Sequence, residues 1–265
     1  MNITTMIISV ATLALLGLFI GLFLGIAAKK LAVEVDPREE KILNALPGAN
    51  CGGCGYAGCS AMAAAIVKGE APVNGCPVGG DEVGKKVAKI MGIEAGAAVR
   101  LRAFVKCNGD CENAVKQYEY TGVKDCTMVQ FVPGGGEKAC SYGCTGYGNC
   151  VKACPFDAIH VVNGVAVVDK DACKACGKCV SACPKHLIEL IPYDAGYAVA
   201  CSSKDKGPDA MKKCSVSCIG CGLCKKNCPN DAVTVDSFLA HIDQDKCVAC
   251  GACAAKCPKK CIHEI

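Results

Sequence analysis

The chain has no tryptophan, and aromatic residues make up only 5% of its 265 residues. Large aromatic side chains normally fill much of a sizeable core, so their scarcity argues against one large hydrophobic domain. The apolar share of 52% does not remove this shortage, because it includes 26 cysteines. The composition therefore predicts small modules that are held together by groups bonded to cysteine.

Several catalytic signatures are also missing. The chain has no G-x-G-x-x-G turn after an expected strand, no Walker phosphate loop and no H-E-x-x-H motif. Its histidines are scattered, and no Ser/His/Asp or Cys/His nucleophile set stands out. The scattered histidines are His160, His186, His241 and His263. We therefore expect no hydride chemistry and no catalytic residue on this polypeptide.

Charge is absent from residues 6–28. Crossing a bilayer takes about 20 apolar residues, and a cleavable signal peptide would have a positive start and a shorter apolar stretch. We therefore expect residues 1–28 to form an uncleaved transmembrane helix. Lys29 and Lys30 follow directly, so the positive-inside rule places the N-terminus outside the cell membrane and the later domains in the cytoplasm. Glycines at 17, 21 and 25 share one helix face, which favours close packing against other membrane helices.

All 26 cysteines follow this helix. A reducing cytoplasm disfavours disulfides, so these thiols indicate metal binding. The strongest pattern is C-x2-C-x2-C-x3-C-P, which begins at Cys173, Cys218 and Cys247. In bacterial ferredoxins this run gives three ligands to one [4Fe–4S] cluster and the fourth to its neighbour. Structural zinc sites more often use separated cysteine pairs.

The ferredoxin-like region is duplicated. Cys-Pro pairs occur at 154, 183, 228 and 257, spaced by 29 residues within each unit and by 74 between units. The first motif departs from the pattern, because Tyr147 stands where the 74-residue shift places Cys221; we expect Cys140 to substitute. The predicted ligand sets are Cys140, Cys144, Cys150 and Cys183; Cys173, Cys176, Cys179 and Cys154; Cys218, Cys221, Cys224 and Cys257; and Cys247, Cys250, Cys253 and Cys228.

A separate cysteine block lies closer to the N-terminus. Its glycine-rich spacing predicts a fifth [4Fe–4S] cluster, with zinc as the alternative. The block consists of Cys51, Cys54, Cys59 and Cys76. Of the six remaining cysteines, we expect Cys261 to be a buried thiol. Cys107, Cys111 and Cys126 with Cys201 or Cys214 either bind a sixth cluster or are inert thiols.

These patterns predict an α+β protein with one N-terminal transmembrane helix, a small single-cluster [4Fe–4S] domain and two tandem bacterial-type 2[4Fe–4S] ferredoxin modules. We expect helices over 60–68 and 81–106. Hairpins are predicted from 158–162 with 165–168, around the turn-forming pair Asn163-Gly164, and from 232–236 with 239–243. The expected segments are 1–28 (transmembrane helix), 29–48 (juxtamembrane connector), 49–106 (single-cluster domain), 107–139 (cysteine-containing connecting segment), 140–192 (first ferredoxin module), 193–217 (connecting segment) and 218–265 (second ferredoxin module).

The order of these elements resembles the B subunits of the Rnf complex, an ion-translocating ferredoxin:NAD oxidoreductase. The likeness covers essentially the whole chain, and the block from Cys51 to Cys76 behind a membrane helix makes it specific. It implies an electron-transfer subunit that accepts electrons from soluble reduced ferredoxin. The electrons would pass toward a flavin- and NAD-binding subunit and multi-spanning membrane subunits of a complex that pumps Na⁺ or H⁺.

Two other functions stay open at this point. The chain could be a membrane-tethered polyferredoxin of another redox complex, or a redox reactivator or scaffold of a corrinoid protein, which has a block similar to Cys51–Cys76. Nucleic acid is not an expected partner, although the formal charge is +4. Each oxidised cluster with four thiolates carries a net charge of about −2, so five clusters would make the protein acidic.

Overall fold

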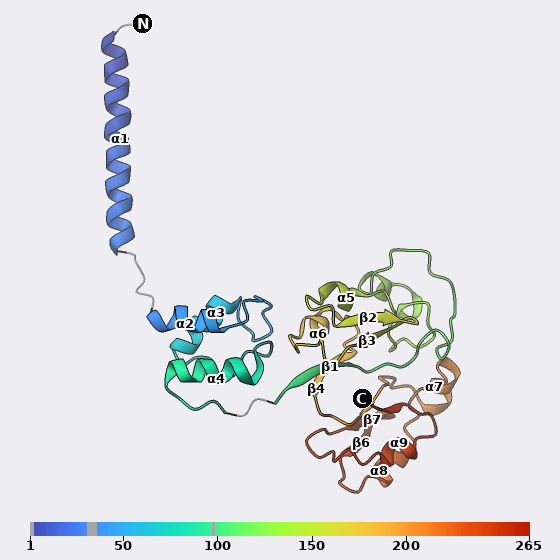
Figure 1. Cartoon of the computed structure of the whole chain (residues 1–265). Helices are drawn as coiled ribbons and strands as arrows, with labels where there is room; N and C mark the ends of the chain where they lie inside the picture. Colours follow the sequence, from blue (N-terminus) through green and yellow to red (C-terminus); the bar gives the residue numbers. More distant parts are fainter. Residues whose placement is uncertain (1–2, 31–35, 97–98) are drawn as a thin grey trace.

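The computed structural model of the chain describes residues 3–30, 36–96 and 99–265. Helix α1 (Ile3–Lys30) extends away from the other elements in Figure 1. Its window Val10–Ala27 has a mean hydropathy of 2.5 and none of it is buried. The expected apolar helix is confirmed, and by length and composition it is a candidate membrane span. Residues 1–2, and residues 31–35 of the expected connector, lie outside the described residues.

Three helices form a small domain after α1. These are α2 (Pro37–Ala45), α3 (Cys59–Val67) and α4 (Gly80–Met91). Asp36 caps α2 by accepting the Arg38 N–H at 2.8 Å, and Pro37 suits the first helical position because its missing N–H needs no partner there. Apolar side chains from all three helices meet in one core. This core includes Ile42, Met62, Ile66 and Val87.

The helix predicted over 60–68 is confirmed by α3, but the prediction of one helix over 81–106 is wrong. Helix α4 ends at Met91, and Gly92 follows in the left-handed conformation, with φ 71°. Glycine has no Cβ to clash there, so it commonly terminates helices. Residues 101–105 instead form strand β1 (Leu101–Val105), and residues 97–98 lie outside the described residues.

Strand β1 belongs to a repeat that we define as residues 101–192, the first repeat. It pairs antiparallel with β4 (Ile188–Pro192), with Leu101 opposite Pro192. Strands β2 (Ile159–Val162) and β3 (Val165–Val168) form the expected hairpin, with positive φ at both Asn163 and Gly164. Helices α5 (Asn149–Ala153) and α6 (Lys178–Ala182) complete the repeat.

The second repeat, residues 197–264, has the same plan. Strand β5 (Tyr197–Val199) pairs with β8 (Ile262–Glu264). The second predicted hairpin is confirmed by β6 (Val233–Asp236) and β7 (Leu239–Ile242). Its short helices are α8 (Leu223–Lys226) and α9 (Ala252–Ala255), and α7 (Gly207–Lys213) precedes them.

Both repeats use a strand that lies upstream of the boundaries expected at 140 and 218. Strands β1 and β5 contain no cysteine and are short, and each pairs with a strand more than 60 residues later. Between β1 and the first cysteine loop, an inserted segment carries the 3-10 turns η1 (Met128–Phe131) and η2 (Pro133–Gly135). Two isolated bridges fasten this segment, Ala114 to Cys214 and Lys116 to Lys138.

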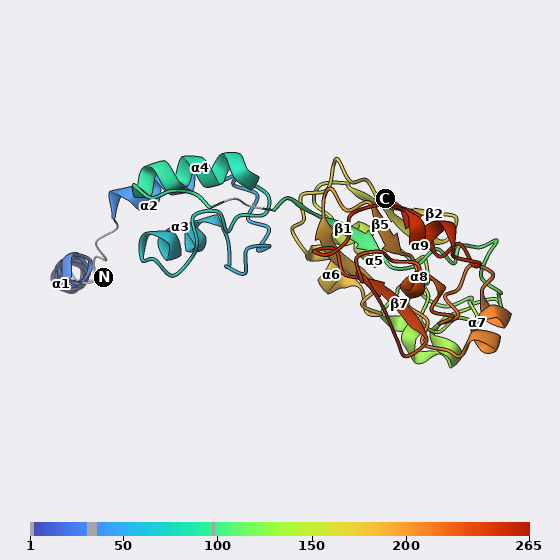
Figure 2. The same cartoon turned by 90° about the horizontal axis from the view of Figure 1, so that it is seen from below.

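The helical domain contacts the first repeat through a loop. A Cβ atom on Gly53 would lie 2.6 Å from the Cys176 carbonyl oxygen, so only glycine allows the two backbones to approach this closely. Figure 2, seen from below, shows the helical domain between α1 and the two repeats. The chain therefore runs from an apolar helix through a small domain to the paired repeats.

Candidate functional site

Backbone N–H groups aim at cysteine sulfurs at equivalent places in the two repeats. The N–H four residues after a Cys-Pro cysteine donates to its Sγ at 3.3–3.4 Å, as in Ala158 to Cys154, Leu187 to Cys183 and Ala232 to Cys228. None of the 26 cysteines forms a disulfide. Hydrogen bonds of this kind stabilise negative charge on sulfur and are a feature of protein-bound iron–sulfur clusters.

One cavity in the second repeat is lined by the expected set of Cys218, Cys221, Cys224 and Cys257. A fifth sulfur joins them, because Cys261 is buried and its Sγ lies 3.6 Å from that of Cys257. Hydrogen bonding with the Cys261 thiol lowers the pKa of Cys257 to about 5 and also lowers the pKa of Cys218. The burial expected for Cys261 is thus confirmed, and its thiol also contacts this cysteine set.

A further expected set also comes together, and so do three cysteines of the last one. Burial raises the pKa of Cys179 to about 11, and repulsion from Cys173, Cys176 and Cys154 adds to the effect. Burial likewise raises the pKa of Cys253, with repulsion from Cys247 and Cys228. In each case, the cysteine of the Cys-Pro pair lies beside the cysteine loop of the other motif in the same repeat. Cys250, by contrast, is exposed.

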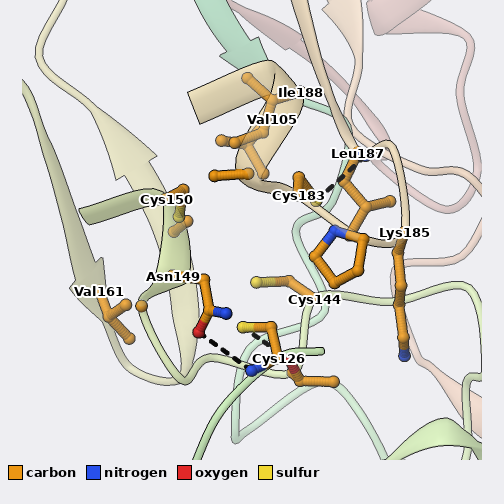
Figure 3. A pocket seen from close by; sticks show the side chains of 15 residues that line it. Val105, Cys126, Cys144, Asn149, Cys150, Val161, Cys183, Lys185, Leu187 and Ile188 are labelled. Atoms are coloured by element: carbon orange, nitrogen blue, oxygen red, sulfur yellow. Dashed lines mark hydrogen bonds between the residues drawn. The ribbon is translucent and has the colours of Figure 1, made fainter. Parts of the chain in front are cut away.

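The remaining set of the first repeat differs from the expectation. Figure 3 shows the cavity near α5, which is lined by Cys126, Cys144, Cys150 and Cys183, and not by Cys140. Burial raises the pKa of Cys150 to about 12, with repulsion from the other three sulfurs. The expected substitution by Cys140 is therefore not what the geometry places here: Cys126 takes the position.

Hydrogen bonds fix Cys126 at this cavity. Its N–H donates to the Asn149 side-chain oxygen at 3.0 Å, and the Thr145 hydroxyl donates to its Sγ at 3.3 Å. Tyr147, which occupies the missing cysteine position, packs against Tyr120 with ring centroids 6.1 Å apart. Spacing could not reveal this arrangement, because Cys126 lies 18 residues before Cys144 and enters from the inserted segment.

Cys140 lines another cavity between the two repeats. Its four cysteines are Cys107, Cys140, Cys201 and Cys214. The Cys144 N–H donates to Cys107 Sγ and the Cys218 N–H to Cys201 Sγ, both at 3.3 Å. The structure thus brings together three of the residues considered for a sixth cluster. It leaves out Cys126 and also Cys111, whose side chain is exposed.

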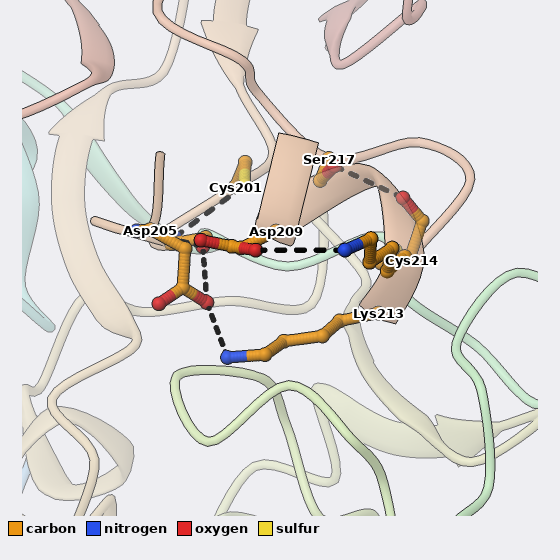
Figure 4. A network of polar contacts seen from close by, with 8 residues as sticks. Cys201, Asp205, Asp209, Lys213, Cys214 and Ser217 are labelled. Atoms are coloured by element: carbon orange, nitrogen blue, oxygen red, sulfur yellow. Dashed lines mark hydrogen bonds and ion pairs between the residues drawn. The ribbon is translucent and has the colours of Figure 1, made fainter. Parts of the chain in front are cut away.

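The cavity between the repeats has a near-symmetric construction. Cys107 and Cys201 each follow a closing strand, β1 or β5, while Cys140 and Cys214 are related by the 74-residue shift. Figure 4 shows how its second-repeat side is held: Lys213 pairs with Asp205 at 2.8 Å, and the Ser217 hydroxyl donates to the Cys214 carbonyl at 2.9 Å. Each repeat therefore contributes two sulfurs.

The N-terminal block gathers in the helical domain. Burial raises the pKa of Cys76, and repulsion from Cys54 and Cys59 adds to the effect. The Gly79 N–H donates to Cys76 Sγ at 3.3 Å. Cys51 stands close enough to Cys176 for the two thiols to affect each other electrostatically. The block therefore faces the first repeat across the Gly53 contact.

The cavities fit a cubane cluster. Within the described residues, no group of three or more His, Cys, Asp or Glu side chains converges tightly enough for a single metal ion. A single zinc ion needs all its sulfurs about 2.3 Å from one point. A [4Fe–4S] cluster instead takes one thiolate at each iron corner, so its ligands surround a cavity, as the sulfurs do here.

Family comparisons agree with this chemistry. Residues 46–78 match the family described as "Putative Fe-S cluster". Residues 137–184 and 217–261 match two families described as "4Fe-4S dicluster domain", and a third such family matches residues 172–233. The matches cover the cysteine block of the helical domain and the cysteine motifs of both repeats. The chain is therefore a [4Fe–4S] protein.

Curated relatives extend the likeness to nearly the whole chain. The chain is 45% identical to the B subunit of the ion-translocating oxidoreductase complex of Methanosarcina acetivorans, over 92% of both proteins. It is 48% identical to the B subunit of the Na⁺-translocating ferredoxin:NAD⁺ oxidoreductase complex of Acetobacterium woodii, over 92% of this chain and 73% of the relative. The proton-translocating counterpart from Clostridium ljungdahlii is 46% identical over 92% of this chain and 86% of its own length.

Identities at this level, over this share of the chain, accompany the cysteine-lined cavities and the apolar N-terminal helix described above. The resemblance noted from the sequence is confirmed. The chain belongs to the B-subunit family of the Rnf-type ion-translocating ferredoxin:NAD oxidoreductases, as an iron–sulfur electron-transfer subunit of a multi-subunit, membrane-associated complex.

Proposed function

We propose that this subunit relays single electrons from soluble ferredoxin to the flavin- and NAD-binding and multi-spanning subunits of its complex, using six [4Fe–4S] clusters. The cavity lined by Cys107, Cys140, Cys201 and Cys214 carries this proposal. It lies between the two repeats and takes sulfurs from both. A cluster there would join two otherwise separate pairs of clusters into one path.

The proposed modules follow the strand pairing and the cysteine sets. Residues 101–192 and 197–264 would each form a two-cluster ferredoxin module, with the sixth cluster between them. Residues 36–92 would form the single-cluster domain. The six proposed ligand sets are Cys51, Cys54, Cys59 and Cys76; Cys126, Cys144, Cys150 and Cys183; Cys173, Cys176, Cys179 and Cys154; Cys107, Cys140, Cys201 and Cys214; Cys218, Cys221, Cys224 and Cys257; and Cys247, Cys250, Cys253 and Cys228.

When bound, [4Fe–4S] clusters supply reversible one-electron exchange at low potential. The protein's part is to hold the thiolates, to direct N–H groups at their sulfurs and to keep water away. Buried side chains such as Cys150, Cys179 and Cys224 keep water away from the cluster sites. The N–H groups of Ala158, Leu187 and Ala232 point at cysteine sulfurs. Hydrogen bonds to sulfur help to set the reduction potential of a cluster.

Electrons would enter at the second repeat and leave toward the helical domain. Cys221 and Cys250 are exposed, so the second repeat presents ligand positions to a soluble protein. At the other end, Gly53 touches Cys176 of the first repeat. Relatives named as ferredoxin:NAD⁺ oxidoreductase subunits support ferredoxin as the donor.

The apolar helix α1 would anchor this path at the membrane as a single span, with its N-terminus outside and the cluster domains in the cytoplasm. Apart from the nearby backbone of its own helix, a Cβ atom at Gly17, Gly21 or Gly25 would meet no heavy atom of the described residues within 4 Å. This open face of small residues favours packing against a helix of another subunit.

The link between the repeats can be tested in the purified complex. In a Cys214→Ser variant, we expect reduced ferredoxin still to reduce the clusters of the second repeat, while ferredoxin-dependent NAD reduction is lost. Spectra recorded after rapid mixing with reduced ferredoxin would separate these two steps. Unchanged NAD reduction in Cys214→Ser would contradict the path. Absence of NAD reduction in the parent complex would contradict the proposed donor and acceptor.

A further inference from the structure

Among the described residues, two charged side chains are buried, and both are cations. Arg102 is 4% exposed and Lys138 is 8% exposed. A buried charge is unfavourable unless an opposite charge compensates it. Neither cation has a carboxylate at ion-pair distance within the part of the chain that the structure describes. Their compensation must therefore come from another source.

Lys138 lies in the wall of the cavity between the repeats. Its Nζ donates to the carbonyls of Gly109 at 2.8 Å and Gly164 at 2.7 Å. These carbonyls satisfy hydrogen bonds but carry no net charge. Gly109, which accepts one of these hydrogen bonds, lies against two sulfurs of this cavity, because a Cβ atom added to it would be 3.2 Å from Cys214 Sγ and 3.8 Å from Cys107 Sγ. Lys138 thus places a buried positive charge beside the sulfurs of the cavity between the repeats.

Arg102 lies on β1 beside the other cysteine set of the first repeat. Its Nε donates to the Tyr193 carbonyl at 3.3 Å, while its Nη2 is buried without a hydrogen-bond partner. Burial lowers the pKa of Arg102, and the charge of the Cys173 sulfur opposes that shift. The neighbouring Ala103 N–H donates to the same sulfur at 3.4 Å. The nearby negative charge is again cysteine sulfur.

The second repeat has no such cation at the matching positions. The 74-residue shift maps Lys138 onto Lys212, whose side chain is 80% exposed and lies 4.0 Å from Asp209. The pairs Val105–Ile188 and Val199–Ile262 align the closing strands, which places Gly196 opposite Arg102 in the alignment. The buried positive charge is therefore confined to the first repeat.

Resting on the proposed function, we propose that Arg102 and Lys138 are counter-charges that hold the reduction potentials of the clusters beside them above those of the second repeat. Net charge is one determinant of cluster potential, and each added electron is favoured by a nearby buried cation that water does not screen. Electrons that enter at the second repeat then gather in the first repeat, beside the helical domain. Neither residue binds a cluster; each acts on the neighbouring cluster through its positive charge.

The test is a redox titration of the purified complex, followed by electron paramagnetic resonance. Lys138→Gln keeps an amide that can donate to the Gly109 and Gly164 carbonyls but removes the charge, whereas Lys138→Arg keeps the charge. Arg102→Gln and Arg102→Lys form the second pair. Lys212→Gln is the matched control, because it removes an exposed cation at the equivalent place.

We expect the most easily reduced clusters to shift to more negative potential in Lys138→Gln and Arg102→Gln. Lys138→Arg, Arg102→Lys and Lys212→Gln should titrate like the parent. Glutamine variants that keep their iron and titrate like the parent would overturn the proposal. So would loss of iron in both glutamine variants, because the two cations would then serve the fold. The iron content of the parent tests the proposed cluster ligands. The proposed function and the role of the two cations can therefore fail separately.

Discussion

The two repeats share one arrangement of strands, short helices and cysteine loops, yet they assemble their sites differently. In the second repeat, the first cysteine set comes from the two motifs alone: Cys218, Cys221, Cys224 and Cys257 line one cavity. In the first repeat, Tyr147 replaces the middle cysteine and Cys126 comes from the inserted segment. The first repeat therefore depends on contacts between distant parts of the chain, and the second depends mainly on local spacing.

The largest expected effect is at this replacement. In Cys126→Ser, the cavity with Cys144 and Cys150 loses one thiolate, and we expect about four fewer irons per chain. Iron and sulfide analysis of anaerobically prepared protein measures this loss. Cys111→Ser is the matched control, since Cys111 is an exposed cysteine of the same segment. Equal iron content in Cys126→Ser and the parent would return the ligand role to Cys140.

The contact at Cys176 is a second difference between the repeats, because the equivalent cysteine of the second repeat, Cys250, is exposed. A methyl group on Gly53 would lie 2.6 Å from the Cys176 carbonyl oxygen. Overpacking of this kind costs about 1–3 kcal/mol, so Gly53→Ala should weaken docking of the helical domain by about tenfold for each 1.4 kcal/mol.

We expect Gly53→Ala to keep its full iron content while its ferredoxin-dependent NAD reduction falls. Gly96→Ala is the control, because among the described residues its new methyl group would meet Asn74 Nδ2 alone, at 3.8 Å. Parent-like NAD reduction in Gly53→Ala would show that electrons do not cross at this contact.

Asn149 is the third difference, since the 74-residue shift replaces it with Leu223. Its side chain accepts the Cys126 N–H at 3.0 Å and donates to Asp125 at 2.9 Å. Each such bond is worth about 0.5–1.5 kcal/mol, so Asn149→Leu should make the neighbouring cluster easier to remove. The measurement is the rate of iron release to a chelator. A rate equal to that of the parent would mean that Asn149 does not hold Cys126.

The smallest effect is expected at Cys261, which corresponds to Leu187 in the first repeat. Cys261→Leu removes a thiol that hydrogen-bonds Cys218 and Cys257. Loss of one bond of about 0.5–1.5 kcal/mol corresponds to about 20–65 mV for one electron. We expect one cluster of the second repeat to titrate at more negative potential, with iron retained. The reverse change, Leu187→Cys, should raise the potential of a cluster in the first repeat.

Much of this arrangement could be predicted from the sequence, because ferredoxin motifs carry their ligands at short fixed spacing. The three regular motifs, both hairpins, helix α3 and the apolar helix α1 all follow from local patterns. The closing strands β1 and β5 did not, since each pairs with a strand far along the chain.

The sequence prediction placed Cys140 where the structure has Cys126, and the reason is again a contact between residues far apart in the chain. The 74-residue shift maps Cys140 onto Cys214, a correspondence that already pointed away from the first motif. Cys107 and Cys201 correspond only when the closing strands are aligned, which requires the strand register. The sequence already suggested a sixth cluster, but its four cysteines and its place between the repeats could be assigned only once the sheets were known.

We propose that cysteines from both repeats hold a sixth cluster between them. Counting iron and acid-labile sulfide in the anaerobically purified full-length chain tests it most directly, in the parent and in Cys107→Ser/Cys201→Ser. We expect about 24 irons per chain in the parent and about 20 in the double variant. About 20 irons in both proteins would contradict it.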